Sequence, residues 1–264
     1  LGYNVKDAGN IDVSVQEALN PGNAKAKFLK EIVSASKKLA QKTYDALAKD
    51  EIPLIMGGDH SIAMGSVAGI SRFYHEKNQK IGLIWLDAHG DINTPETSLS
   101  GNIHGMPLAH ILGKGAPELL ALSEITPMVD PSKAVLVGIR DLDQAERDAI
   151  KEMGVHAFTM RDIDEHGMAR VIKEAIAIAS KGTVGFHVSF DVDFIDPSFA
   201  PGVGTPVRGG ATYREGHLAM ECIYDTGKML SIECTETNPI LDVANQTAQF
   251  ACGMLLSAFG KRIL

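Results

Sequence analysis

The sequence predicts an α/β fold in which a mainly parallel β-sheet is covered by helices on both faces. Short runs rich in Ile, Val, Leu and aromatic residues alternate with longer amphipathic stretches along the chain. The short runs are almost continuously apolar, as strands buried on both faces are. Such alternation of strands and helices is typical of a parallel sheet. No repeat, low-complexity tract or linker interrupts the pattern, so we expect residues 1–264 to form one domain.

Six segments are expected as strands because each is short, apolar and bounded by turn residues. In chain order they are residues 52–56, 81–86, 134–139, 156–160, 185–190 and 230–234. Six further segments carry helical periodicity. They are residues 24–48, 62–76, 144–153, 162–179, 213–225 and 246–259. In the fourth of these, Asp162 is expected to cap the start of the helix, and Gly182 lies just past its end.

The composition of the 264 residues excludes several classes of protein. With 45% hydrophobic and 22% charged residues, the chain has the make-up of a soluble globular protein. Its formal net charge of −8 argues against nucleic acid or an anionic membrane surface as a partner. No apolar run reaches the roughly 18 residues of a membrane span. The three cysteines, Cys222, Cys234 and Cys252, indicate reduced thiols in a cytoplasmic protein.

Two long polar connections, residues 87–105 and 191–213, begin where predicted strands end. Long irregular segments in a compact α/β domain are usually functional, and open parallel sheets place their sites at the carboxyl ends of strands.

Three motifs at such strand ends carry carboxylate and imidazole groups. Asp87-Ala88-His89-Gly90-Asp91 follows residues 81–86, and Asp191-Val192-Asp193 follows residues 185–190. In an extended backbone, residues two apart point to the same side, so the side chains of each motif can converge. A third motif, Gly57-Gly58-Asp59-His60-Ser61, follows residues 52–56, and its glycines permit a sharp turn that presents the histidine. If these strand ends are neighbours, the site holds His60, Asp87, His89, Asp91, Asp191 and Asp193.

Charge decides what such a site must contain. Four ionised aspartates close together would repel one another and raise their pKa values unless cations lay between them. Two divalent ions would neutralise the four carboxylates and leave room for a bridging hydroxide. Oxygen-rich, imidazole-assisted coordination without thiolate favours Mn²⁺, or a similar borderline-hard ion, over a structural zinc. Two bridged ions lower the pKa of a shared water.

Each motif alone is also compatible with helix capping or with binding of backbone amides. The three together, each directly after an apolar strand, favour a metal site. Asp59 is excluded from the ligand set and is expected to orient a ligand. The remaining histidines lack carboxylates nearby in the sequence and are expected to be surface or core residues. They are His75, His110, His156, His166, His187 and His217.

The motifs at 57–61, 87–91 and 189–193 together resemble the signature blocks of the ureohydrolases, the family of arginase, agmatinase and their relatives. The resemblance runs through almost the whole chain. It implies a binuclear manganese hydrolase, with two Mn²⁺ per chain, in a three-layer α/β/α fold around a mainly parallel sheet. It also implies a homotrimer or homohexamer. By that match one ion is held by His60, Asp87, Asp91 and Asp191, and the other by Asp87, His89, Asp191 and Asp193, with Asp87 and Asp191 bridging.

The loops resemble the arginase branch of the family, in which the loop before His104-Gly105 binds the amino-acid end of the substrate. Neutral donors suit a carboxylate that has no arginine partner, and the loop supplies them from Asn93, Ser98, Ser100 and Asn102. The resemblance also implies that Asp143 and Glu146 receive the α-amino group. Glu236, in Thr235-Glu236-Thr237-Asn238-Pro239, matches the glutamate that pairs with the guanidinium, and Thr205 matches the threonine that supports this glutamate.

The implied reaction is hydrolysis of L-arginine to L-ornithine and urea by a hydroxide that bridges the metal ions. Asp91 is the expected acceptor of its proton, and His104 is the candidate proton shuttle. Agmatinase, or another guanidino-acid hydrolase, is the alternative within the enzyme class. A catalytically silent paralogue acting as a regulator is the alternative outside it, and such a paralogue is expected to have lost ligands that this chain retains.

Three features depart from the family pattern. The family opens with a strand and a glycine-rich loop before the position of Leu1, so the sheet of this chain is expected to be one strand short. Thr235 and Thr237 replace the more usual apolar flanks of Glu236, and no meaning can be assigned to Arg208.

Overall fold

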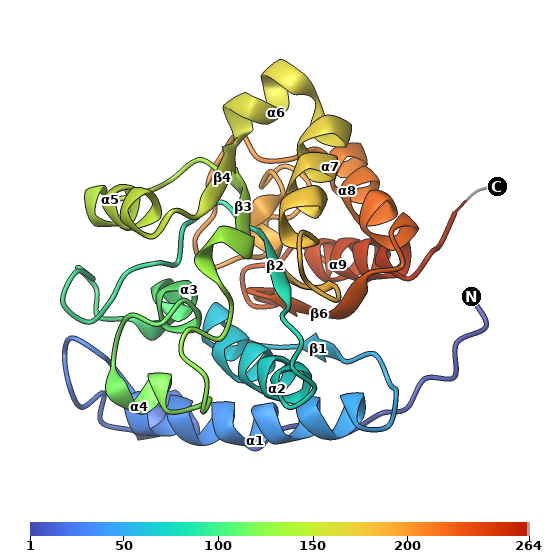
Figure 1. Cartoon of the computed structure of the whole chain (residues 1–264). Helices are drawn as coiled ribbons and strands as arrows, with labels where there is room; N and C mark the ends of the chain where they lie inside the picture. The colour runs from blue at the N-terminus through green and yellow to red at the C-terminus, as the bar shows by residue number, and fades with distance from the viewer. Residues whose placement is uncertain (263–264) are drawn as a thin grey trace.

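The computed structural model describes residues 1–262, and a six-stranded sheet runs through the middle of the fold (Figure 1). Its strands are β1 (Leu54–Met56), β2 (Gly82–Leu86), β3 (Ala134–Ile139), β4 (His156–Thr159), β5 (Phe186–Asp191) and β6 (Met229–Thr235). Their order in the sheet is β1-β6-β5-β2-β3-β4, and every pairing is parallel. The predicted parallel α/β architecture is therefore confirmed.

The two faces of the sheet pack against different helices. The helices are α1 (Leu29–Leu47), α2 (Ala63–His75), α3 (Pro107–Ile111), α4 (Pro117–Leu120), α5 (Gln144–Met153), α6 (Met160–His166), α7 (Met168–Ala179), α8 (Tyr213–Asp225) and α9 (Gln246–Ala258). Ile84 and Leu86 of β2 pack into a core formed with α7, α8 and α9, whereas Leu83 and Trp85 pack into a second core formed with α2, α3 and α5. Helix α1 lies outside α2 (Figure 1). The alternation along β2 thus separates the two cores.

The helices differ from the predicted ones in four respects. Helix α1 begins at Leu29, because Phe28 has a left-handed backbone with φ 56° that ends any helix arriving from the earlier residues. The segment expected as one helix over residues 162–179 is two, α6 and α7, because Gly167 at φ 79° breaks it. Asp162 was expected to cap a helix that follows it, but it lies within the first turn of α6. There it forms a capping box with Thr159, the residue just before the helix. The short α3 and α4 were not predicted, since neither shows a full helical period.

The two edge strands, β1 and β4, are more exposed than predicted, since burial on both faces was expected for every strand. In β1 Leu54 and Met56 are exposed, and β4 is largely exposed as well. The cause is position, because an edge strand has a neighbour on one side only. In the central strands β2, β3 and β5, every residue is buried, as the continuous apolar runs predicted.

The sheet places the three motifs at its carboxyl edge. Strands β1, β6, β5 and β2 are consecutive neighbours, so the residues that follow them emerge side by side. Among residues 1–262, none of the helices is both long enough and apolar enough to span a bilayer.

Candidate functional site

His60 is presented by a tight turn directly after β1. A Cβ on Gly57 would lie 2.1 Å from the end of the Ile62 side chain, so a larger residue at this step would require that side chain to shift. Asp59 then caps a 3₁₀ turn over residues 60–62 by accepting a hydrogen bond from Ser61 N at 3.0 Å. Asp59 contacts Ser61 by its side chain and lies outside the carboxylate cluster. The turn buries His60 with its ring directed toward the ends of β2 and β5.

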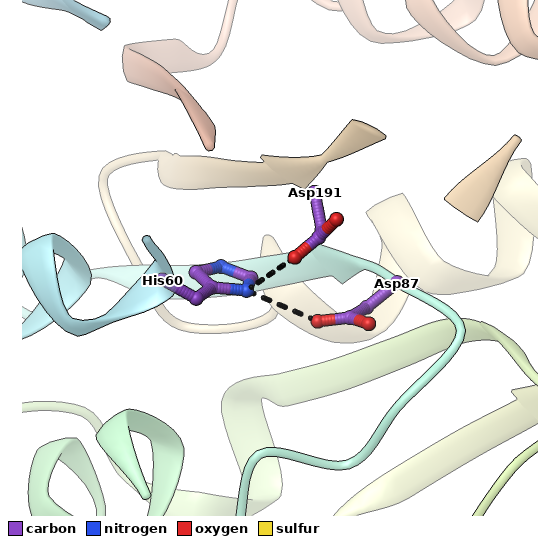
Figure 2. Close-up of side chains that lie close together, drawn as sticks. All are labelled: His60, Asp87 and Asp191. Atoms are coloured by element: carbon purple, nitrogen blue, oxygen red, sulfur yellow. Dashed lines mark ion pairs between the residues drawn. The ribbon is translucent and has the colours of Figure 1, made fainter. Parts of the chain in front are cut away.

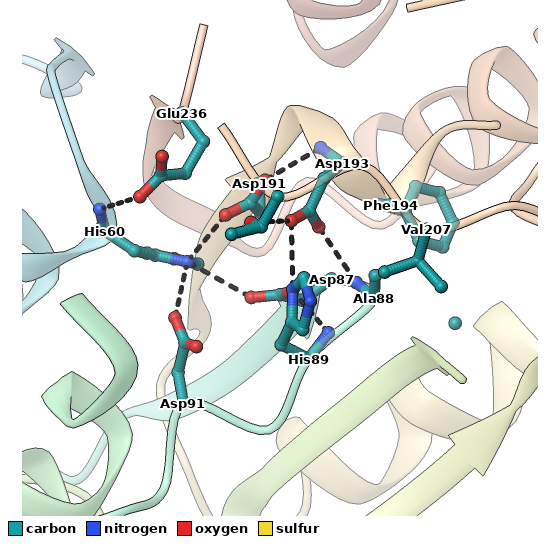
Figure 3. Close-up of polar contacts among 12 residues, drawn as sticks. His60, Asp87, Ala88, His89, Asp91, Asp191, Asp193, Phe194, Val207 and Glu236 are labelled. Carbon is teal, nitrogen blue, oxygen red and sulfur yellow. Dashed lines mark hydrogen bonds and ion pairs between the residues drawn. The ribbon is translucent and has the colours of Figure 1, made fainter. Parts of the chain in front are cut away.

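Three aspartates surround the Nδ1 atom of His60 (Figure 3), and Figure 2 shows two of them, Asp87 and Asp191. The distances from Nδ1 are 3.1 Å to Asp87 Oδ2, 3.1 Å to Asp91 Oδ2 and 3.0 Å to Asp191 Oδ2. His60 Nδ1 is buried and makes no hydrogen bond of good geometry. It is therefore a free nitrogen aimed at carboxylate oxygens, which is the arrangement of a metal ligand.

A second cluster shares Asp87 with the first. His89 Nδ1 lies 3.0 Å from Asp193 Oδ2 and 3.5 Å from Asp87 Oδ1. Two groups of side chains offer ligand atoms within 4.8 Å of one another, namely His60, Asp87 and Asp191, and Asp87, His89 and Asp193. The structure thus brings together all six residues predicted from the three motifs, in two adjacent clusters with Asp87 common to both.

Backbone and indole N–H groups donate hydrogen bonds to three of the aspartates. Asp87 accepts from His89 N at 2.6 Å and from Trp85 Nε1 at 2.8 Å. Asp193 Oδ1 accepts from Ala88 N at 3.1 Å, and Asp191 Oδ1 accepts from Asp193 N at 2.7 Å (Figure 3). These bonds hold the three carboxylates in place. Asp191 Oδ2 and Asp193 Oδ2 are left facing His60 and His89, whereas both oxygens of Asp87 accept a hydrogen bond and also lie toward the two histidines.

The two clusters crowd buried carboxylates together, and this shifts the pKa values of their side chains. Burial and the charge of Asp87 raise the pKa of Asp91 to about 6, and burial with neighbouring carboxylates also raises the pKa values of Asp191 and Asp193. Burial alone would lower the pKa of His60, but contacts with the aspartates outweigh it and raise that pKa well above its ordinary value. The raised pKa values show that this group of carboxylates and imidazoles lacks positive charge. Divalent cations would supply that charge, and these oxygen and nitrogen atoms are suitable ligands for them.

A cavity opens over these clusters and is lined by most of the predicted substrate residues. Those lining it are Asn93, Ser98, Ser100, Asp143, Glu146, Thr205, Glu236 and His104. Asn102 is not among the lining residues, and its Oδ1 accepts a hydrogen bond from Lys27 Nζ at 3.2 Å. Leu99, at 94% exposure, also lines the cavity and had no signal in the sequence.

Glu236 lies between the first cluster and His104. Its Oε1 accepts from His60 N at 2.8 Å and lies 3.3 Å from His104 Nδ1. Burial opposes ionisation of Glu236, but the contacts with His104 and His60 N outweigh it and lower the pKa of this carboxyl. The hydrogen bond from His104 to Glu236 raises the pKa of the imidazole despite its burial. The Thr205 hydroxyl donates to Asp193 Oδ2 at 3.2 Å, and its expected support of Glu236 stays a prediction.

At the other end of the cavity, Asp143 and Glu146 form the capping box of α5. Asp143 accepts from Glu146 N at 2.9 Å, and Glu146 accepts from Asp143 N at 3.1 Å. Asn93 Nδ2 donates to the free oxygen of Asp143 at 2.8 Å. Burial and the nearby charges of Asp91 and Asp143 raise the pKa of Glu146 to about 7. This end of the cavity is therefore acidic and suits a cationic amine.

Some residues that support the site were missed from the sequence. Arg140 donates five hydrogen bonds to backbone carbonyls, including that of Asp193, and follows β3 directly. His187 is a core residue, as expected, but it has a carboxylate neighbour that is distant in sequence, because its Nε2 lies 3.2 Å from Glu233 Oε1. The position of Arg140 directly after a buried strand was a signal that could have been used. The contact of His187 with Glu233 depends on the pairing of β5 with β6, for which the sequence shows no local signal.

Comparisons with known proteins agree over nearly the whole chain. A family model described as the Arginase family matches residues 1–260. An arginase of Brevibacillus brevis is 48% identical over 264 residues, which cover 100% of this chain and 87% of that protein. The native structure of arginase from Bacillus caldovelox at pH 5.6 superposes with a TM-score of 0.93 at 46% identity, covering 98% of this chain and 85% of that one. An Entamoeba histolytica arginase in complex with L-ornithine gives 0.84 at 35% identity, with 91% and 80% covered.

Proposed function

Because the chain belongs to the arginase family, we propose that it hydrolyses the guanidino group of L-arginine to give L-ornithine and urea. It is a hydrolase of arginase type, and the alternative of an agmatinase is not favoured, since relatives with 48%, 45% and 46% identity over the full chain carry the name arginase. The observation that carries the proposal is the convergence of six imidazole and carboxylate side chains at one end of a cavity.

Two divalent ions, which we assign as Mn²⁺, would be held by the two clusters. His60, Asp87, Asp91 and Asp191 would hold one ion, and Asp87, His89, Asp191 and Asp193 the other. The fit is supported by the free Nδ1 of His60 and by the mutual repulsion of the buried carboxylates. Bound there, the ions would lower the pKa of water so that hydroxide is available near neutral pH.

The cavity offers a site for each end of the substrate. Glu236 is a carboxylate matched to a planar guanidinium, and it lies beside the first cluster. Asp143 and Glu146 would receive the α-amino group. The α-carboxylate would be bound by the neutral donors Asn93, Ser98, Ser100 and Asn102, of which Asn102 would have to turn toward the cavity from its contact with Lys27. Thr205 would support the site through Asp193.

Proton transfer is assigned to two residues near the guanidinium end. Asp91, whose pKa is raised to about 6, would accept the proton of the attacking water and pass it to the departing amine. His104 would carry protons between the cavity and solvent, because its side chain is part exposed, at 32%, and contacts Glu236.

We further propose that the whole chain is one ureohydrolase domain that works in the cytoplasm as a homotrimer or homohexamer. Three cysteines without disulfide partners among the described residues support a reducing compartment. The family resemblance supports the assembly, and light scattering of the purified protein measures it.

Metal analysis combined with a urea-release assay tests the proposed function. The purified chain is stripped with a chelator and reloaded with Mn²⁺, and urea is measured with L-arginine or agmatine as the substrate. We expect two ions per chain, loss of turnover on stripping and recovery on reloading, with arginine preferred. Preference for agmatine would contradict the proposed carboxylate site, and urea release without any divalent ion would contradict the proposed metal role.

A further inference from the structure

A line of buried polar side chains continues from His60 into the sheet, on the side of the ring away from the aspartates. His60 Nε2 lies 2.7 Å from Ser189 Oγ, and Ser189 Oγ donates to Glu233 Oε1 at 2.7 Å. Beyond the glutamate, His187 Nε2 lies 3.2 Å from Glu233 Oε1, and His187 Nδ1 lies 2.8 Å from Ser231 Oγ. Ser189, Glu233 and His187 are all 0% exposed. The proposed reaction uses none of them.

The register of the sheet fixes this line against the histidine. Trp85 pairs with Ser189, and Ser189 pairs with Glu233, so the three lie in one row across β2, β5 and β6. Paired residues on neighbouring strands point to the same face. The Trp85 ring stacks on the His60 ring with centroids 4.1 Å apart and planes 12° apart. The imidazole is therefore held on its flat side by Trp85 and on its edge by Ser189.

The hydrogen bonds along the line have only one consistent direction when Nδ1 of His60 faces a cation. A neutral imidazole that offers Nδ1 as a ligand carries its proton on Nε2. Nε2–H then donates to Ser189, whose single hydroxyl proton is directed to Glu233. An ionised Glu233 can only accept, so it fixes the direction of both bonds.

A purely structural role leaves the charge of Glu233 unexplained. Burial raises the pKa of this carboxyl, but the contact with His187, the nearby His60 and the hydrogen bond from Ser189 together outweigh burial and lower the pKa overall. Its second oxygen, Oε2, has no hydrogen-bond partner. A buried carboxylate left half satisfied is costly unless it acts on a further charge. Carboxylates that hold metal-ligating histidines in orientation act in this way.

We propose that Glu233 is a positioning residue, which acts through Ser189 to fix the tautomer and orientation of His60 and so tightens binding of the ion at the first cluster. The inference rests on the proposed metal function. It is specific to one of the two ions, because the line meets His60 and has no contact with His89.

The test measures binding of each Mn²⁺ to the chelator-stripped full chain, using buffered free Mn²⁺. Ser189→Ala removes the link, and Glu233→Gln removes the charge while keeping an oxygen that can accept. We expect one ion to bind about 10–100-fold more weakly in Ser189→Ala and about tenfold more weakly in Glu233→Gln, with the other ion unchanged. Electron paramagnetic resonance should then show the hyperfine pattern of an isolated Mn²⁺ at concentrations that give a coupled pair in the wild type.

Ser231→Ala is the matched control, because it removes a buried serine bonded to the far side of His187 and leaves the link to His60 intact. Its affinities are expected to equal those of the wild type. Thermal unfolding of the stripped chains reports whether each variant folds, and Ser189→Ala decides the question if Glu233→Gln does not fold. Unchanged affinities in a folded Ser189→Ala chain, or an equal loss for both ions, would overturn the positioning role alone. A wild-type chain that binds no divalent ion would overturn the proposed function together with this inference.

Discussion

Replacing Arg140 should destabilise the loop that carries Asp193 of the second cluster. This half-buried guanidinium donates to the backbone carbonyls of Val207, Gly138, Phe194 and Asp193, at distances from 2.5 to 3.2 Å. Its five donors thus join the end of β3 to residues 193–194 and to residue 207. Arg140→Met keeps much of the side-chain volume but removes every donor, whereas Arg140→Lys keeps the charge.

The size of the effect follows from the bonds that are lost. An unpaired buried acceptor costs about 1–3 kcal/mol, and at the low end of that range four carbonyls give about 4 kcal/mol for Arg140→Met. A lysine has no planar fork and can reach only part of this set, so we expect about 2 kcal/mol for Arg140→Lys. The Met variant also loses a positive charge near Asp193 and Asp87. A loss of about 4 kcal/mol is a large part of the 5–15 kcal/mol that stabilises a typical protein.

Urea unfolding of the chelator-treated chain at pH 7 measures these differences without a contribution from bound ions. Arg147→Met is the matched control, because Arg147 is exposed and donates one hydrogen bond, to Leu142 O at 3.2 Å. It should change the free energy of unfolding by less than about 0.5 kcal/mol. The reasoning is refuted if Arg140→Met lies within about 1 kcal/mol of the wild type, or if the Met and Lys variants are equally unstable.

Three further substitutions test the proposed chemistry and its pH dependence. Glu236→Gln should lower kcat/KM for arginine about 10–100-fold with metal content unchanged, because the guanidinium loses a charged partner; undiminished kcat/KM would remove that role. His104→Asn should lower turnover about 100-fold, and unchanged turnover across the pH range would exclude His104 as the proton shuttle. Glu146 has a folded pKa of about 7 against an ordinary 4.5, so the folded state retains a proton that the unfolded state releases. The free energy of unfolding of the stripped chain should fall as pH rises from 4.5 through 7, by on the order of 3 kcal/mol from this group. Glu146→Gln should flatten the fall, and equal slopes in urea titrations would contradict the assignment.

The residues of the two metal clusters could be predicted because each follows a buried apolar strand directly. Local pattern placed His60, Asp87 and Asp191 after three strands, β1, β2 and β5. These strands run parallel within one sheet, in the order β1-β6-β5-β2, which brought the side chains together. Their roles as ligands stay a prediction. The contacts of the residues assigned to the substrate were harder to predict. Thr205 contacts Asp193, and Asn102 contacts Lys27.

What could not be predicted depends on the register between strands distant in sequence. His187 lies beside Glu233 because β5 pairs with β6, and no local pattern specifies that pairing. The break between α6 and α7 had a visible signal in Gly167. It was missed because the apolar period continues across that glycine, whose positive φ sets a new helix direction.

Two residues assigned to the chemistry have left-handed backbones, Asp91 with φ 48° and Glu236 with φ 63°. Each such conformation costs on the order of 1 kcal/mol for a residue other than glycine. Selection for stability alone would therefore favour glycine at both positions. Asp91→Gly should raise the free energy of unfolding of the stripped chain while abolishing turnover. Directed evolution of this enzyme for heat resistance, without a screen for activity, is therefore expected to accept glycine at these two positions and so lose activity.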